Sequence, residues 1–151
     1  MELVTTLKRS ESEIVKEALS TLQHSHIAHY EQAGAEFTHT ALKDLFDLVA
    51  RAIEQRDLEG VIAFADDIAE QRFSSGFDIS EVQTAFNALE TAMWRRVLAA
   101  EEPADLPESI GLVSTVFGVA KDELACRYVS LASQRDIPSL DLSAQFKGSA
   151  T

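Results

Sequence analysis

Residues 72–96, RFSSGFDISEVQTAFNALETAMWRR, contain the signals that decide the fold. Gly76 is of the residue type that commonly ends a helix in a left-handed conformation. Asp78 predicts the start of the next helix, because its carboxylate can accept from the backbone of Glu81 while the Glu81 side chain reaches back. Apolar residues then recur every three or four positions, at Ile79, Val82, Phe86, Leu89, Met93 and Val97. The stretch therefore predicts a helix end, a glycine turn and a long amphipathic helix.

Outside this stretch, similar start and stop signals predict about five helices in all and no strand. The other four cover roughly residues 10–33, 36–55, 58–74 and 107–134. Pro138 should prevent simple continuation of the last helix. We therefore expect an all-α bundle, with residues 1–135 as a single helical domain and residues 136–151 as a C-terminal tail.

The composition narrows the classes of partner and location. The chain has 151 residues and a net charge of -12, so it should be repelled by nucleic acid and by anionic membranes. A basic protein partner suits this charge better. The first residues lack a signal-peptide pattern, no apolar run is long enough to span a bilayer, and Cys126 is the single cysteine. These observations favour a cytoplasmic protein.

The residues that could carry chemistry do not form a recognised catalytic or metal-binding pattern. All four histidines fall within the first 39 residues, and only His26 and His29 share a helix face. Glu36 and His39 have the spacing used in di-iron bundles, but the second such motif is missing. The later helices offer no histidine as a haem ligand, and no nucleophile motif or phosphate-binding loop is present. Asp66, Asp67 and Glu70 fit a solvated helix face. We therefore predict no metal, no haem or other cofactor, and no enzymatic activity.

Two helix faces remain as candidates for binding. On the helix after Gly76, one stripe beside the apolar face carries Gln83, Asn87, Glu90 and Trp94. These residues fit either hydrogen bonding between helices at the edge of the core or a surface for a partner or ligand.

The last helix has a face of small residues that includes Gly111, Thr115 and Gly118. Two glycines inside a helix cost about 1 kcal/mol each relative to alanine, so a close approach by another helix should offset that cost. The approaching helix could belong to the same chain or to a second copy, and the sequence leaves both alternatives open.

Residues 42–98 resemble the N-terminal domain of RsbT co-antagonist proteins, the RsbR-type regulators, which also precedes some bacterial histidine kinases. Two short features carry part of the resemblance: the turn at Arg56 and Asp57, and the pair Arg72 and Gly76. The other part is the helix that follows, which begins with Phe77, Ile79, Glu81 and Val82 and ends with Trp94, Arg95 and Arg96. It implies an all-helical, bundle or globin-like domain without haem, usually dimeric, that acts as a sensory or protein-interaction module. No STAS domain or kinase region follows the helices in this sequence.

From these features we predict a bacterial signalling domain that acts by homodimerisation and by binding a protein partner. We expect contacts at Gln83, Asn87, Glu90 and Trp94, next to a turn shaped by Gly76 and Phe77. We also expect Arg72 to contribute, paired with Glu81 or Glu90 across the turn. The alternative is a small-molecule sensor with a ligand pocket between helices, lined by apolar side chains and a few inward polar groups.

Overall fold

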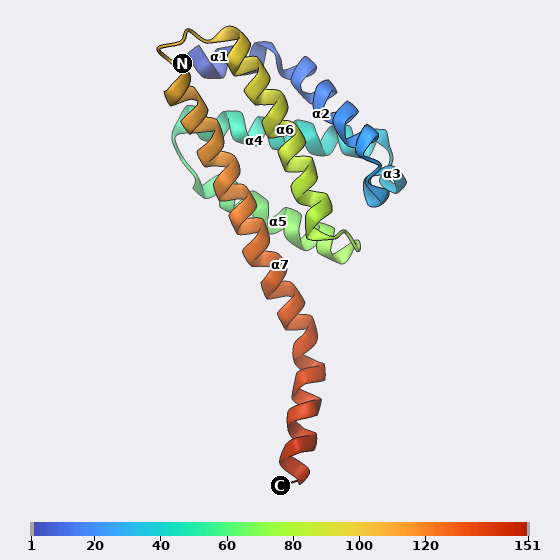
Figure 1. Ribbon diagram of the computed structural model, residues 1–151. Coiled ribbons are helices and arrows are strands. Elements are labelled where there is room, and N and C mark those ends of the chain that lie inside the picture. Colours follow the sequence, from blue (N-terminus) through green and yellow to red (C-terminus); the bar gives the residue numbers. More distant parts are fainter. Residues whose placement is uncertain (1, 151) are drawn as a thin grey trace.

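The computed structural model describes the backbone of residues 2–150 and the side chains of residues 3–133. Within these residues the fold is all-α, which confirms the predicted fold class, but seven helices form where about five were expected (Figure 1). In chain order they are α1 (Glu2–Arg9), α2 (Glu11–Ser25), α3 (Ala28–Ala33), α4 (Ala35–Gln55), α5 (Glu59–Ser74), α6 (Ile79–Ala100) and α7 (Leu106–Ala150).

The N-terminal region accounts for the two additional helices. Residues 2–9 form α1, which was not predicted, and its Leu3, Val4 and Leu7 are buried in the core. The first predicted helix is divided at His26, whose left-handed conformation (φ 52°) ends α2 before α3 begins. A histidine is not a residue type that signals a left-handed helix end, so the sequence pattern did not reveal this break.

Helix α6 lies at the centre of the packing. It contacts α2 on one side and α7 on the other, while α5 packs along α7 (Figure 1). The apolar stripe predicted for α6 is confirmed, since Val82, Leu89 and Met93 are fully buried. Truncating a leucine in such a position to alanine typically costs about 2–5 kcal/mol of stability. The stripe therefore fixes α6 between its neighbours and sets where the preceding turn must lie.

Helix α7 continues to Ala150, so the prediction that the helix ends near residue 134 is wrong for the backbone. The prediction relied on Pro138, which removes one backbone hydrogen bond and crowds the preceding turn. A helix can continue across that local loss. The division into a helical domain at residues 1–135 and a C-terminal tail at residues 136–151 stays a prediction.

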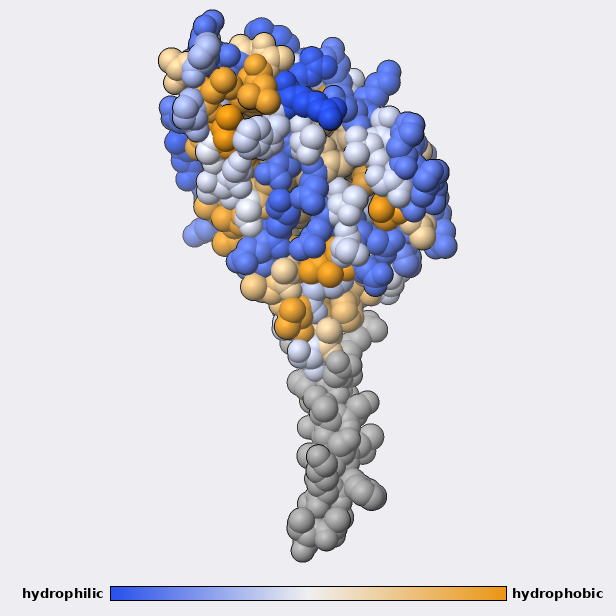
Figure 2. Space-filling model, viewed as in Figure 1, coloured by the Kyte–Doolittle hydropathy of each residue, from blue (hydrophilic) through white to orange (hydrophobic). Residues whose placement is uncertain are grey.

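The surface is mostly hydrophilic in this view, with small hydrophobic patches scattered over it, some of them near the place where α7 leaves the body of the molecule (Figure 2). Among the described residues, no helix combines the length and apolar character needed to cross a bilayer.

Candidate ligand and interaction sites

The turn between α5 and α6 forms as the sequence predicts. Gly76 has a φ of +88°, its N–H donates to the carbonyl of Phe73, and the N–H of Phe77 donates to the carbonyl of Arg72. These two bonds form the Schellman arrangement that ends a helix. Asp78 and Glu81 form the predicted capping box, with the Asp78 N–H 2.9 Å from Glu81 Oε1. The turn therefore reverses the chain and presents both Arg72 and Phe77 to the interior, where each is buried.

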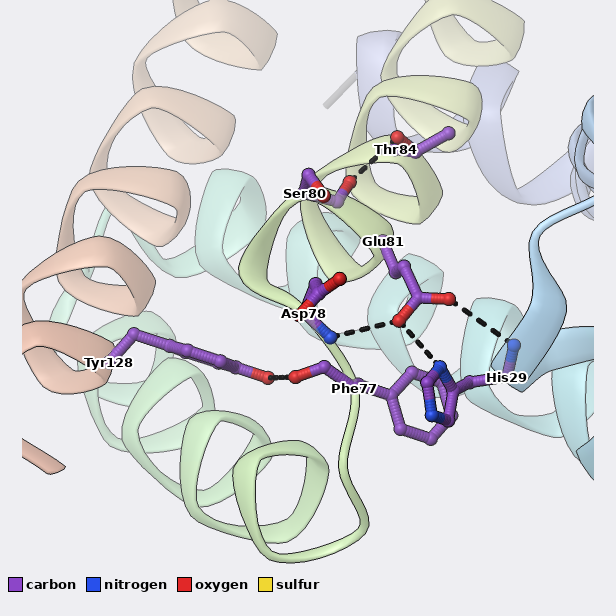
Figure 3. Close-up of polar contacts among 7 residues, drawn as sticks. All are labelled: His29, Phe77, Asp78, Ser80, Glu81, Thr84 and Tyr128. Carbon is purple, nitrogen blue, oxygen red and sulfur yellow. Dashed lines mark hydrogen bonds and ion pairs between the residues drawn. The ribbon is translucent and has the colours of Figure 1, made fainter. Parts of the chain in front are cut away.

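Glu81 also connects this turn to α3 (Figure 3). The backbone N–H of His29 donates to Glu81 Oε2 at 3.2 Å, and His29 Nδ1 lies 2.7 Å from Oε1. Burial opposes ionisation of this carboxyl, but the hydrogen bonds from Asp78 and His29 outweigh it and lower the pKa of Glu81. The carboxylate therefore remains charged and holds three segments of the chain together.

Tyr128 of α7 closes the other side of the turn. Its hydroxyl donates to the carbonyl oxygen of Phe77 at 3.1 Å (Figure 3), and its ring meets Phe73 edge-on at 5.6 Å between centroids. Burial of the ring is the main reason that the pKa of Tyr128 rises to about 12. The hydroxyl is thus a neutral donor that ties α7 to the backbone of the turn.

Arg72 is the most unusual residue of this region, because its charged side chain is only 6% exposed. The guanidinium carbon lies 4.8 Å from the ring centre of Phe37 and 5.6 Å from that of Phe77. Its Nε atom is buried without a hydrogen-bond partner among the described residues. We name Arg72, Phe37, Phe77 and Tyr30, which meets Phe77 edge-on at 4.9 Å, the arginine–aromatic cluster.

The expected pairing of Arg72 with Glu81 or Glu90 is wrong. Glu81 is occupied by His29 and Asp78, whereas Glu90 accepts from Lys121 at 2.9 Å. Arg72 forms no ion pair with any carboxylate among the side chains described. It lies in the last turn of α5, where its side chain is directed into the ring cluster instead of across the turn.

Two hollows adjoin the arginine–aromatic cluster. An inner cavity of about 20 Å³ is lined by Arg72 and by side chains of α3, α4, α5 and α6. An outer pocket of about 390 Å³ lies between α2, α3 and the start of α4. Tyr30 and Thr38 line both hollows, so these two residues form the wall that the cavities share.

The stripe predicted on α6 lies partly at its contact with α7. Lys121 donates to Asn87 Oδ1 and to Glu90 Oε1, both at 2.9 Å. Trp94 is partly buried against the core, and Gln83 is partly exposed. The structure therefore groups Arg72 with Phe77 and places Asn87 and Glu90 on a separate contact with α7. A role of the stripe in binding a partner stays a prediction.

The small residues of α7 lie on an exposed face. A Cβ atom added to Gly111 or Gly118 would meet no described atom within 4 Å, so no close helix approach within the chain is seen there. Gly111 and Thr115 instead line an open groove of about 340 Å³ between the end of α4 and the start of α7. A contact between two copies at this face stays a prediction.

Four residues of the region were not assigned to a site from sequence: His29, Tyr30, Phe37 and Tyr128. They come from α3, α4 and α7 and meet only through tertiary packing, so no local spacing connects them. The pairing of His29 with Glu81 across 52 positions has no sequence signal of its own. Among the described residues, no group of three or more metal-ligating side chains is found.

Comparison with known families places these features in context. The family model of the RsbT co-antagonist protein rsbRD N-terminal domain matches residues 12–129. The chain belongs to this family. The match confirms the resemblance seen in the sequence, extends it beyond residues 42–98, and identifies the chain as a regulatory signalling domain. The arginine–aromatic cluster lies within the matched part of this rsbRD N-terminal domain. No curated protein and no solved structure matches the chain.

Proposed function

We propose that this domain is a non-enzymatic regulatory module that self-associates as a homodimer and binds a protein partner in a signalling pathway. The observation that carries the proposal is the open groove between α4 and α7, together with the exposed small residues beside it. Family membership supports the regulatory role.

The groove has the character of a helix-packing surface. Ile53 and Leu58 line one side, and Leu112 and Val116 line the other. Because Gly111 lacks a side chain and has open space above it, the backbone of a partner helix can approach α7 closely at this point. Such an approach would offset the cost of two glycines within a helix, which is about 1 kcal/mol each.

A test should place bulk and charge on this face without disturbing the core. Thr115 is exposed and lines the groove, so Thr115→Arg should abolish the dimer while leaving the helical content unchanged. Thr40→Arg, on an exposed position of α4, is the matched control and should keep the dimer. Sedimentation velocity measures both. A wild-type monomer at micromolar concentrations, or a Thr115→Arg dimer, would refute the homodimer.

The polar stripe on α6 is the second surface in the proposal. Asn87 is exposed, and with Glu90 it already accepts from Lys121. A protein partner with a basic side chain at this point would replace Lys121 and meet Trp94 nearby on the same stripe. We expect Trp94→Ala to weaken capture of such a partner more than Asp66→Ala does, and equal effects would remove this surface from the proposal.

A second candidate function is the sensing of a small molecule. It is favoured by the two hollows that share Tyr30 and Thr38, one of which reaches the buried Arg72. An apolar pocket with few polar groups is the usual form of a small-molecule site.

A further inference from the structure

We propose that Arg72 is the anion-binding residue of an internal site for a small organic carboxylate with an apolar body. The proposal names the ligand class for the sensing function and rests on that candidate function. It is independent of self-association, because Arg72 does not line the groove between α4 and α7.

The charge of Arg72 is the first argument. The Arg72 residue is only 6% exposed, yet it forms no ion pair with any described carboxylate. Its charge acts on two tyrosines, Tyr30 and Tyr128, and both are neutral. The nearby carboxylate of Glu81 is already engaged by His29 and Asp78.

The two rings beside Arg72 compensate its charge only in part. Stacking of a guanidinium on an aromatic face is attractive, but it provides no acceptor for the N–H groups. Nε in particular is buried without a partner. A carboxylate matches the planar fork of arginine with two acceptor oxygens, so it would satisfy both the charge and the unpaired donor.

The two cavities are the second argument, because their volumes and lining residues indicate the size and character of the rest of the ligand. The inner cavity beside Arg72 has about 20 Å³, the space of roughly one water molecule, and its walls include Leu42, Leu45 and Phe86. The outer pocket of about 390 Å³ holds the larger volume, and its lining combines the apolar Leu19, Leu22 and Ile27 with polar residues such as Gln23 and Glu31. An apolar body fits the outer pocket, and a carboxylate head fits the inner cavity once the shared wall moves.

Tyr30 and Thr38 form that wall, and the proposal requires both to move aside when the ligand binds. Tyr30 now interacts with Arg72, which is one of the effects that oppose the burial-driven rise in its pKa. Thr38 donates to the carbonyl of Gly34 at 3.0 Å. A ligand carboxylate would take the place of the Tyr30 hydroxyl on Arg72.

Electrostatics also orients the ligand. Glu31 lines the outer pocket, while Arg72 lines the inner cavity. A carboxylate is repelled by the first and attracted by the second, so its charged end should point inward. A neutral alcohol of the same length gains nothing from this arrangement.

The experiment is a calorimetric titration of the whole chain with hexanoate, compared with hexanol and with acetate. We expect hexanoate to bind and hexanol to bind about 10- to 100-fold more weakly, the usual effect of losing a hydrogen-bonded charge. Acetate, which lacks the apolar body, should also bind more weakly than hexanoate. No binding of hexanoate, or equal binding of either comparison compound, would overturn the proposal.

Two variants locate the site. Arg72→Met keeps the length of the side chain and should reduce hexanoate affinity about 10- to 100-fold, whereas Arg95→Met, at an exposed arginine paired with Glu17, should not change it. Ala35→Leu narrows the outer pocket without touching Arg72 and should weaken hexanoate but not acetate. Unchanged hexanoate affinity in Arg72→Met or Ala35→Leu would overturn the proposal.

The same variants separate this proposal from the dimer and from misfolding. Circular dichroism checks that Arg72→Met retains its helices. If this variant loses its helices, the hexanoate affinity of Ala35→Leu tests the site instead. Sedimentation velocity should show the same oligomeric state for Arg72→Met as for the wild type. Loss of binding with an unchanged oligomer supports the carboxylate site even where the proposed dimer fails.

Discussion

At the scale of single residues, Glu81 carries the clearest pH dependence. Its carboxylate receives the N–H of Asp78 at 2.9 Å and lies 2.7 Å from His29 Nδ1, and together these contacts lower its pKa despite the opposing effect of burial. A lowered folded-state pKa stabilises the protein above the unfolded value of 4.5, and this stabilisation is lost as the pH falls through the folded value.

We therefore expect Glu81→Gln to lower the free energy of unfolding by about 1–2 kcal/mol at pH 6. The difference from the wild type should shrink between pH 6 and pH values below the lowered pKa of Glu81, because the wild-type carboxylate is then protonated and has lost its charge. Urea unfolding followed by circular dichroism measures the difference. Glu102→Gln, in the exposed loop before α7, is the control and should change stability by less than about 0.5 kcal/mol. A difference that stays constant between these pH values would contradict the assigned role.

The residue scale also shows which parts of the candidate sites could be predicted. Gly76 and the capping box of Asp78 and Glu81 depend on residues within six positions, and their local signals were sufficient. Arg72 was singled out because of its place in the family motif, but its pairing was predicted wrongly. Its true neighbour Phe37 lies 35 positions earlier in the chain, and only the packing of α4 against α5 brings the two together.

At the scale of helices, the left-handed residues at helix ends are where sequence reasoning was weakest. Helix α4 is followed by Arg56 as its C-terminal cap, with φ 53° and ψ 42°, a conformation that normally favours glycine. Its only described ion pair is an exposed contact with Glu108 at 3.5 Å, and such a contact stabilises little. The steric strain of a Cβ atom in this conformation is about 1–2 kcal/mol.

Arg56→Gly should therefore raise the free energy of unfolding by about 0.5–1 kcal/mol, after allowance for the greater freedom of glycine in the unfolded chain. Arg51→Gly is the matched control, because Arg51 is exposed about one turn before the end of the same helix, where the backbone is still helical. That change should lower stability by about 1 kcal/mol. Thermal and urea unfolding measure the change in the free energy of unfolding for both variants. If both variants change it in the same direction, the left-handed conformation of Arg56 carries no strain.

The helices themselves were predictable to the extent that their signals are regular. The bounds of α4 and α6 follow the apolar period and the caps closely. The break at His26 and the short helix α1 were missed, because neither has a glycine, a proline or a sustained apolar period. The continuation of α7 past Pro138 was not predicted either, because proline usually ends a helix. The backbone of α7 nevertheless stays helical across this residue.

At the scale of the whole molecule, charge and the exposed groove act in opposite directions. Each chain carries a net charge of -12, so two copies repel each other at long range. The groove itself is nearly neutral, since its lining includes one arginine and one glutamate, Arg56 and Glu108, which pair with each other. Any association of two copies through the groove must therefore depend on apolar contact and must overcome a diffuse repulsion.

This opposition predicts the effect of salt on assembly. The range of electrostatic repulsion falls from about 30 Å at 0.01 M salt to about 10 Å at 0.1 M, whereas burial of apolar groups is not weakened by salt. Homodimerisation should therefore become several times tighter over this range, as measured by the concentration dependence of sedimentation. Binding of a basic partner should weaken over the same range, because screening then reduces an attraction. Thr115→Arg should remain monomeric at every salt concentration. It therefore removes homodimerisation, which salt strengthens, and leaves binding of the basic partner, which salt weakens. A wild-type dimer that weakens with added salt would mean that complementary charges, and not the apolar groove, hold the two copies together.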